Sequence, residues 1–145
     1  MSSVVEKFIY NGVIYSKKNN KRIITNKKTG KPQIVSSQQA KEMEAEMQAQ
    51  FSMQAMAKGW GQRVANDDDH IYEVTICITE KDHTRRDLDN QATSILDALV
   101  CAMILPDDSV KYLHSLHVVY MGVDKYDPKA EITIEQCDRN AVENA

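Results

Sequence analysis

The sequence predicts one α+β domain in which two main helices pack on one face of a mixed β-sheet. Its 145 residues are enough for a single hydrophobic core and point to one domain over residues 1–145. The periodic segments follow one another as strands, a helix, a strand, a helix and two strands. Because this order contains too few helical crossovers for a doubly wound sheet, we expect the helices to share one face.

Each element is predicted from hydrophobic period and residue type. Alternation and β-branched or aromatic residues indicate strands at residues 4–14, 22–25, 32–35, 72–80, 117–121 and 130–134. Helix-forming residues and a period near 3.6 indicate helices at residues 40–57 and 91–103. Ser37 is the expected N-cap of the first helix, and Gly59 ends it. The strands at 22–25 and 32–35 are expected to form a hairpin, and the last two strands to pair across the 122–128 loop.

The apolar sides of the two helices differ in composition. The first is a methionine-rich stripe that predicts core or dimer packing, formed by Met43, Met47, Phe51, Ala55 and Met56. The second is a mainly aliphatic stripe formed by Ala92, Ile95, Leu96, Leu99, Val100 and Met103. Asn90, Thr93 and Asp97 follow one flank of the second stripe, which predicts a polar edge along that helix.

Charge is distributed unevenly along the chain. The formal net charge is −3, yet residues 7–41 contain no acidic residue and nine basic ones: Lys7, Lys17, Lys18, Lys21, Arg22, Lys27, Lys28, Lys31 and Lys41. This asymmetry predicts a basic arm, at about residues 7–35, that faces a polyanion. A solvated basic face without a partner is the alternative.

Several classes of protein are disfavoured by what the sequence lacks. No apolar run approaches the roughly 20 residues needed to cross a bilayer, and the N-terminus has no apolar stretch typical of a signal peptide. Three cysteines, odd in number and without a Cys-x-x-Cys pair, indicate reduced thiols. We therefore expect a cytoplasmic protein without a membrane partner.

Two acidic groups flank the second helix. The run Asp-Leu-Asp-Asn occupies residues 87–90, and Asp107 and Asp108 follow the helix. If residues 87–89 are extended, both carboxylates of the run lie on one side of the chain. The second pair can join them only if the chain after Pro106 doubles back along the helix. Clustered carboxylates repel one another, and Mg²⁺ relieves that repulsion while keeping positions for water and phosphate.

Other interpretations of these acidic residues were weighed against the metal site. They could simply cap the helix and form a turn after the proline. An EF-hand loop that begins at Asp87 would need Gly and Glu where the chain has Ala92 and Ala98. The sequence has no phosphate-binding Walker loop, no His-Glu-x-x-His motif and no Cys/His cluster. A carboxylate-held Mg²⁺ beside arginines and a basic arm indicates phosphodiester hydrolysis.

These residues resemble the RusA-type Holliday junction resolvases, crossover junction endodeoxyribonucleases of bacteria and their phages. The resemblance rests on Arg-Asp-Leu-Asp-Asn at 86–90, Asp-Ala-Leu at 97–99 and Leu-Pro-Asp-Asp-Ser-Val at 105–110, with weaker matches at 16–19 and 34–37. It implies a RusA-like α+β homodimer that resolves four-way junctions by paired symmetric nicks in recombination and repair. A two-fold dimer suits a two-fold junction.

The resemblance also implies roles for individual residues. Asp87, Asp89 and Asp108 would bind Mg²⁺ (or Mn²⁺) and be catalytic, within a metal-site core at about residues 72–135. The supporting residues would be Asn90, Thr93, Asp97 and Asp107. The residues expected to contact DNA are Lys17, Lys18, Asn19, Lys21, Arg22, Lys27, Lys28, Arg85 and Arg86.

One position departs from the family pattern. Four residues after its second Asp the family usually has a lysine important for cleavage, and this chain has Thr93. Lys111, Arg85, Arg86 or a lysine of the arm could substitute for it. Two main hypotheses remain, an active Mg²⁺-dependent structure-selective endonuclease and a catalytically weakened junction-binding protein. A third is a purely structural α+β protein.

Overall fold

The structure, a computed structural model, describes residues 3–15, 21–25, 27–36 and 38–143, and of residues 21–25, 32–36 and 143 it describes the backbone. The elements are β1 (Ser3–Asn11), β2 (Lys21–Thr25), β3 (Pro32–Ser36), α1 (Gln38–Lys58), β4 (His70–Glu80), α2 (Leu88–Cys101), β5 (Leu113–Val123), β6 (Lys129–Asp138) and α3 (Arg139–Glu143). They form a single α+β domain, as the sequence predicts.

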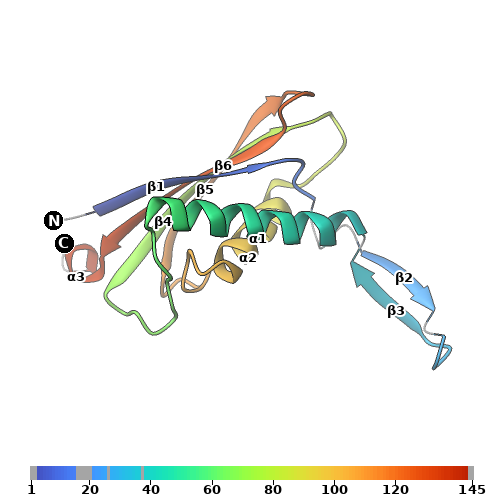
Figure 1. Cartoon of the computed structure of the whole chain (residues 1–145), viewed down its shortest axis with the longest axis horizontal. Helices are drawn as coiled ribbons and strands as arrows, with labels where there is room; N and C mark the ends of the chain where they lie inside the picture. Colours follow the sequence, from blue (N-terminus) through green and yellow to red (C-terminus); the bar gives the residue numbers. More distant parts are fainter. Residues whose placement is uncertain (1–2, 16–20, 26, 37, 144–145) are drawn as a thin grey trace.

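A four-stranded mixed sheet is the centre of the domain. Its strand order is β1-β6-β4-β5, in which β4 and β5 are parallel and the other neighbours are antiparallel. Strand alternation turns Val74, Ile76 and Ile78 of β4 toward the core. Both α1 and α2 cover this one face (Figure 1), so the predicted arrangement of helices is confirmed.

Aromatic packing joins the long helix to the edge of the sheet. Phe8 of β1 is fully buried and makes edge contacts with Phe51, at 6.4 Å between ring centroids, and with Trp60, at 5.8 Å. Met43 and Met47 are buried on the same side of α1. The N-terminal strand therefore belongs to the body of the domain, although the sequence assigned residues 7–11 to the basic arm.

The sheet order corrects one prediction. The last two strands, β5 and β6, do not pair with each other, because β4 lies between them. The segment β4–α2–β5 is a parallel strand–helix–strand unit, whose crossover places β5 beside β4 on one side. The chain then returns and pairs β6 with the other side of β4.

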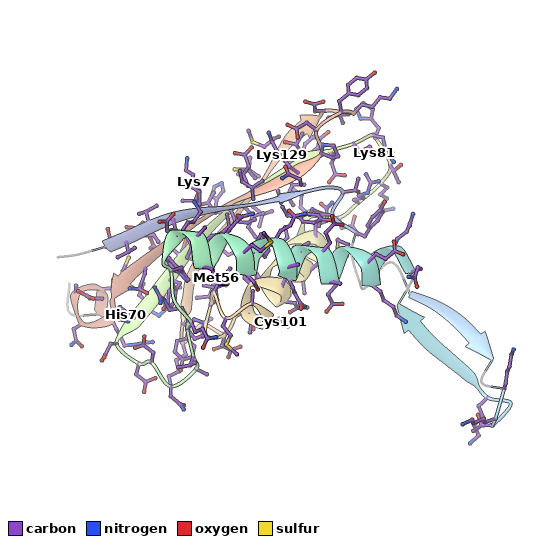
Figure 2. All side chains as sticks on the ribbon, in the orientation of Figure 1. Lys7, Met56, His70, Lys81, Cys101 and Lys129 are labelled. Atoms are coloured by element: carbon purple, nitrogen blue, oxygen red, sulfur yellow. The ribbon has the colours of Figure 1, made fainter. Side chains whose placement is uncertain are left out.

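The helix ends also differ from expectation. α2 begins at Leu88, three residues earlier than predicted, and Met103 lies beyond its end with a positive φ of 59° and an exposed side chain. On α1, Met56 points away from the core and is 84% exposed (Figure 2). The short α3 has no counterpart in the prediction.

The β2–β3 hairpin projects from the body as a separate two-stranded sheet (Figure 1). Lys27 and Lys28 are exposed in its turn. The predicted DNA contacts Lys17, Lys18 and Asn19 lie outside the described residues, as does the predicted cap Ser37, and the side chains of Lys21 and Arg22 are likewise not described. No helix in the described ranges is long and apolar enough to span a membrane.

Candidate metal and nucleic-acid site

A buried carboxylate fixes the loop between β4 and α2. Glu80 continues the inward alternation of β4 and is only 7% exposed. Its Oε2 accepts a hydrogen bond from Arg86 Nη1 at 2.7 Å, and its Oε1 accepts one from Gln91 Nε2 at 2.6 Å. Arg86 Nη1 also donates to Asp82 Oδ1 at 3.0 Å. Neither Glu80 nor Gln91 is among the residues predicted from the sequence, although the inward alternation over residues 72–78 extends to Glu80.

The chain leaves the body for the basic arm beside this loop. Gln91 Nε2 also donates to the backbone oxygen of Ile14 at 3.0 Å. The Arg86 guanidinium lies 6.0 Å from the ring centroid of Tyr15, the last residue described before β2. The start of α2 and the root of the arm are therefore held together.

Asp87 occupies the N-cap position of α2 but does not act as a side-chain cap. Its backbone is extended, with φ −92° and ψ 124°, and its carboxylate makes no capping hydrogen bond. The carboxylate instead lies 3.7 Å from Arg85 Nε and accepts a hydrogen bond of 3.5 Å from Asn90 Nδ2. Simple helix capping thus does not account for this side chain.

Asp89 lies within the first turn of α2, and its side chain is exposed. The Thr93 hydroxyl donates to the backbone oxygen of Asp89 at 3.0 Å. Because the helix already begins at Leu88, the expected period-two alternation over residues 87–89 is wrong. Leu88 packs against the core, and Asp89 is exposed in the first helical turn and not extended alongside Asp87.

The second acidic pair returns toward α2. Asp108 N donates to Asp107 Oδ1 at 2.9 Å. Partial desolvation, the charge of Asp107 and, more weakly, the charge of Asp97 raise the pKa of Asp108 above its usual value. Asp97 lies eight residues beyond Asp89, about 12 Å along the helix axis. Asp108 therefore lies within electrostatic range of Asp97, in the second half of α2.

The three predicted metal ligands are not in mutual contact. Of the described residues, only Glu73, Glu135 and Cys137 place three possible ligand atoms within 4.8 Å of one another. Burial and then the charge of Glu135 raise the pKa of the Cys137 thiol, and a thiolate is a softer ligand than Mg²⁺ prefers. Carboxylates such as Asp87, Asp89 and Asp108 suit Mg²⁺ chemically. Because Asp108 interacts with Asp97 and not with Asp89, the chain as well as the side chains would have to move for all three to hold one ion.

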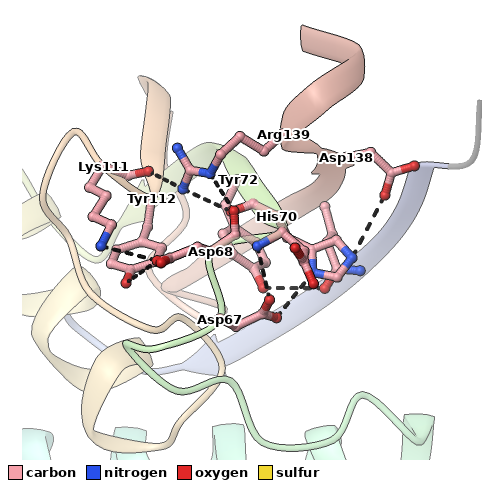
Figure 3. Close-up of polar contacts among 10 residues, drawn as sticks. Asp67, Asp68, His70, Tyr72, Lys111, Tyr112, Asp138 and Arg139 are labelled. Atoms are coloured by element: carbon pink, nitrogen blue, oxygen red, sulfur yellow. Dashed lines mark hydrogen bonds and ion pairs between the residues drawn. The ribbon is translucent and has the colours of Figure 1, made fainter. Parts of the chain in front are cut away.

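The candidate substitutes for the missing lysine differ in their availability. Lys111 Nζ lies 3.0 Å from Asp68 Oδ1 and 5.3 Å from the ring centroid of Tyr112 (Figure 3). This cluster lies beside the start of β4, whereas the acidic motif follows the opposite end of that strand. Arg86 is bound to Glu80 and Asp82, as described above. Arg85, by contrast, has a side chain that is 92% exposed beside Asp87.

A cavity of about 340 Å³ lies next to the acidic run. It is lined by Glu80, Asp82, His83, Thr84, Arg85, Arg86, Leu88, Gln91 and Tyr120. The cavity thus brings both arginines of the motif together with an aromatic side chain of β5.

No protein-family model matches the sequence, and no curated protein matches it.

Proposed function

We propose that this chain is a Mg²⁺-dependent endodeoxyribonuclease that acts on branched DNA as a homodimer, as the RusA-type resolvases do. The observation that carries the proposal is Asp87. Its carboxylate sits at a helix N-cap without capping the helix and lies beside Arg85 and Asn90. Because this carboxylate makes no bond to the helix backbone, binding a ligand would cost only its contacts with Arg85 and Asn90.

The cationic and the acidic side chains have different roles in the proposed reaction. Arg85 and the exposed Lys27 and Lys28 bind and orient the DNA backbone. The N-terminus of α2 adds a favourable field for phosphate. Mg²⁺ held by Asp87, Asp89 and Asp108 would supply charge neutralisation and a more acidic water. The arm begins beside the start of α2, at Ile14 and Tyr15, so DNA bound at the base of the arm would lie on the side of the domain that carries Asp87.

A nicking assay tests the proposal. Pure protein is incubated with an end-labelled synthetic four-way junction, with Mg²⁺ and with chelator. We expect paired symmetric nicks that require Mg²⁺ and disappear in Asp89→Asn and Asp108→Asn, with rates at least about 100-fold lower because charge stabilisation of the transition state is lost. Junction binding in a gel-shift assay should persist, since removing a negative charge does not weaken attraction to phosphate.

Asp69→Asn is the matched control, because Asp69 is an exposed aspartate at the opposite end of β4. Its nicking rate should equal that of the wild type. Loss of binding together with cleavage in Asp89→Asn would contradict the assigned role, and so would equal loss of activity in Asp69→Asn.

A second candidate function is favoured by Thr93, whose hydroxyl is bonded within the helix, and by Lys111, which is paired with Asp68. A protein without a cation at the scissile phosphate would bind junctions and leave them uncut. This hypothesis expects tight, salt-sensitive binding without a Mg²⁺-dependent product. Under it, Thr93→Lys would create nicking activity that the wild type lacks.

A further inference from the structure

The two edges of the main sheet are treated differently. At the β1 edge, side chains of α1 occupy the backbone groups that a further strand would use. Gln54 Oε1 accepts a hydrogen bond from Ile9 N at 2.8 Å, and Gln54 Nε2 donates to Ile9 O at 2.6 Å. Gln50 Oε1 accepts from Asn11 N at 3.1 Å. The part of this edge from Ile9 to Asn11 is therefore closed to another strand.

The β5 edge carries no such protection. Among the described strands, β5 pairs only with β4. Over its 11 residues, Leu113–Val123, it contains no Asp, Glu, Lys, Arg or Pro, the residues with which edge strands normally resist pairing. Leu116 is 43% exposed and Tyr120 is 50% exposed. A long, uncharged and partly apolar edge is suited to pairing with another strand.

The register of β5 indicates that the strand best suited to pair with this edge is β5 of a second copy. Leu116, Val118 and Tyr120 pair with the buried Val74, Ile76 and Ile78, so they point to the helix-covered face. The regular pairing between the two bulges runs from Ser115 to Tyr120. A two-fold axis perpendicular to the sheet keeps each face on its own side. Two copies of β5 can therefore meet only with the axis centred on a residue.

If the two-fold axis passes beside Val118, the exposed apolar residues of the two strands face one another. An antiparallel pair centred there sets Leu116 of each copy opposite Tyr120 of the other, twice by symmetry, and joins the two apolar faces. Cross-strand pairs between aromatic and aliphatic side chains are favourable. No Asp, Glu, Lys or Arg meets a like charge across the pair, because the strand contains none of these residues. The exposed side chains of β5 are thus complementary to those of β5 in a second copy.

We propose that β5 is the interface of a symmetric dimer, in which it pairs antiparallel with β5 of a second copy about Val118 to form an eight-stranded sheet. This goes beyond the proposed function, which requires two copies but does not say which surfaces meet. It also stands independently of any nuclease activity.

Sedimentation equilibrium of the full chain tests the proposal. The wild type should have twice the 16.5 kDa mass of the chain at micromolar concentration. Leu116→Lys and Tyr120→Glu should each weaken dimerisation about tenfold or more, because each places two charges in an apolar interface. The double variant L116K/Y120E sets opposite charges across the axis, so it should dimerise more tightly than either single variant.

Met56→Lys is the control, because Met56 is 84% exposed on α1, and its dissociation constant should equal that of the wild type. Hydrogen exchange of the unmodified protein adds a measurement without mutation, in which β5 amides should gain protection as concentration rises. A monomeric wild type would overturn the proposal. So would single variants as dimeric as Met56→Lys, a double variant no tighter than the singles, or β5 exchange that is independent of concentration.

Discussion

Arg86 is held by two carboxylates, with a side chain that is only 13% exposed. Its substitution by Met would leave Glu80 buried without its ionic partner, which costs about 3 kcal/mol of unfolding free energy. Urea denaturation should show this loss for Arg86→Met. Arg85→Met, at a neighbouring side chain that is 92% exposed, should change the unfolding free energy by no more than about 0.5 kcal/mol. Equal effects would mean that Arg86 does not hold the loop.

Arg85 and Arg86 therefore have different roles despite their adjacency. The sequence predicts both as DNA contacts, because charge and spacing treat them alike. The buried Glu80 separates them, since it binds Arg86 and leaves Arg85 beside Asp87.

Asp108 gives a prediction with a defined sign. Partial desolvation and neighbouring acids raise its pKa in the folded state. Just above the ordinary Asp pKa, about 3.9, the folded protein thus binds more protons than the unfolded chain, and stability falls as pH rises through this window. In metal-free buffer, Asp108→Asn should be more stable than the wild type at pH 7. Near pH 3.5 the difference should vanish.

Urea midpoints at the two pH values measure this effect. A D108N variant that is less stable than the wild type at pH 7 would contradict the prediction. The Asp108 carboxylate is electrostatically unfavourable in the metal-free protein and is proposed to be required for cleavage. Removing it would therefore raise stability and lower activity together, a common trade-off at functional sites.

At the scale of elements, the β2–β3 hairpin is a projection whose lysines lie in its turn. Lys27→Glu with Lys28→Glu should weaken junction binding and reduce the slope of log affinity against log salt by about two, one for each lost phosphate contact. Fluorescence anisotropy at several salt concentrations measures both quantities. The fold should be unaffected, because these residues are exposed in a turn.

Lys7→Glu with Lys58→Glu is the matched control for net charge. Both side chains lie on the body, on β1 and at the end of α1. If this control lowers affinity and salt slope as much as the hairpin variant does, overall charge and not the hairpin governs binding.

The α2 helix explains why the acidic run is only partly assembled. The helix begins at Leu88, whose side chain packs against the core, so Asp89 has helical and not extended geometry after Asp87. A sequence pattern locates such a helix by its apolar stripe, which is clearest in the middle. The residue at which the helix starts decides the direction of each carboxylate. Packing of Leu88 on the core, and not the local sequence pattern, fixes that residue.

For the whole molecule, the position of β1 decides the domain organisation. Phe8→Ala should lower the unfolding free energy by about 3–5 kcal/mol, because it opens a cavity among Phe51 and Trp60. Ile9→Ala, at a neighbouring side chain that is 39% exposed on the other face, should cost much less. Thermal and urea unfolding monitored by circular dichroism compare them. A small effect of Phe8→Ala on the unfolding free energy would mean that β1 belongs to the basic arm and not to the body of the domain.

The sequence by itself determined the elements, the helix-covered sheet and the candidate residues. These features depend on local hydrophobic periods and residue types, because the face of a helix or strand that is buried must be apolar. Glu80 shows that the same alternation could have revealed one residue more.

Only the tertiary structure decided the strand order, the start of α2, the pairing of Arg86 with Glu80 and of Lys111 with Asp68, and the separation of the three predicted metal ligands. Each depends on contacts between segments far apart in the chain, such as β6 with β4 and Asp68 with Lys111. Local propensity carries no information about which distant partner a strand or a charge will meet, because several pairings satisfy the same pattern and packing of the complete core selects one.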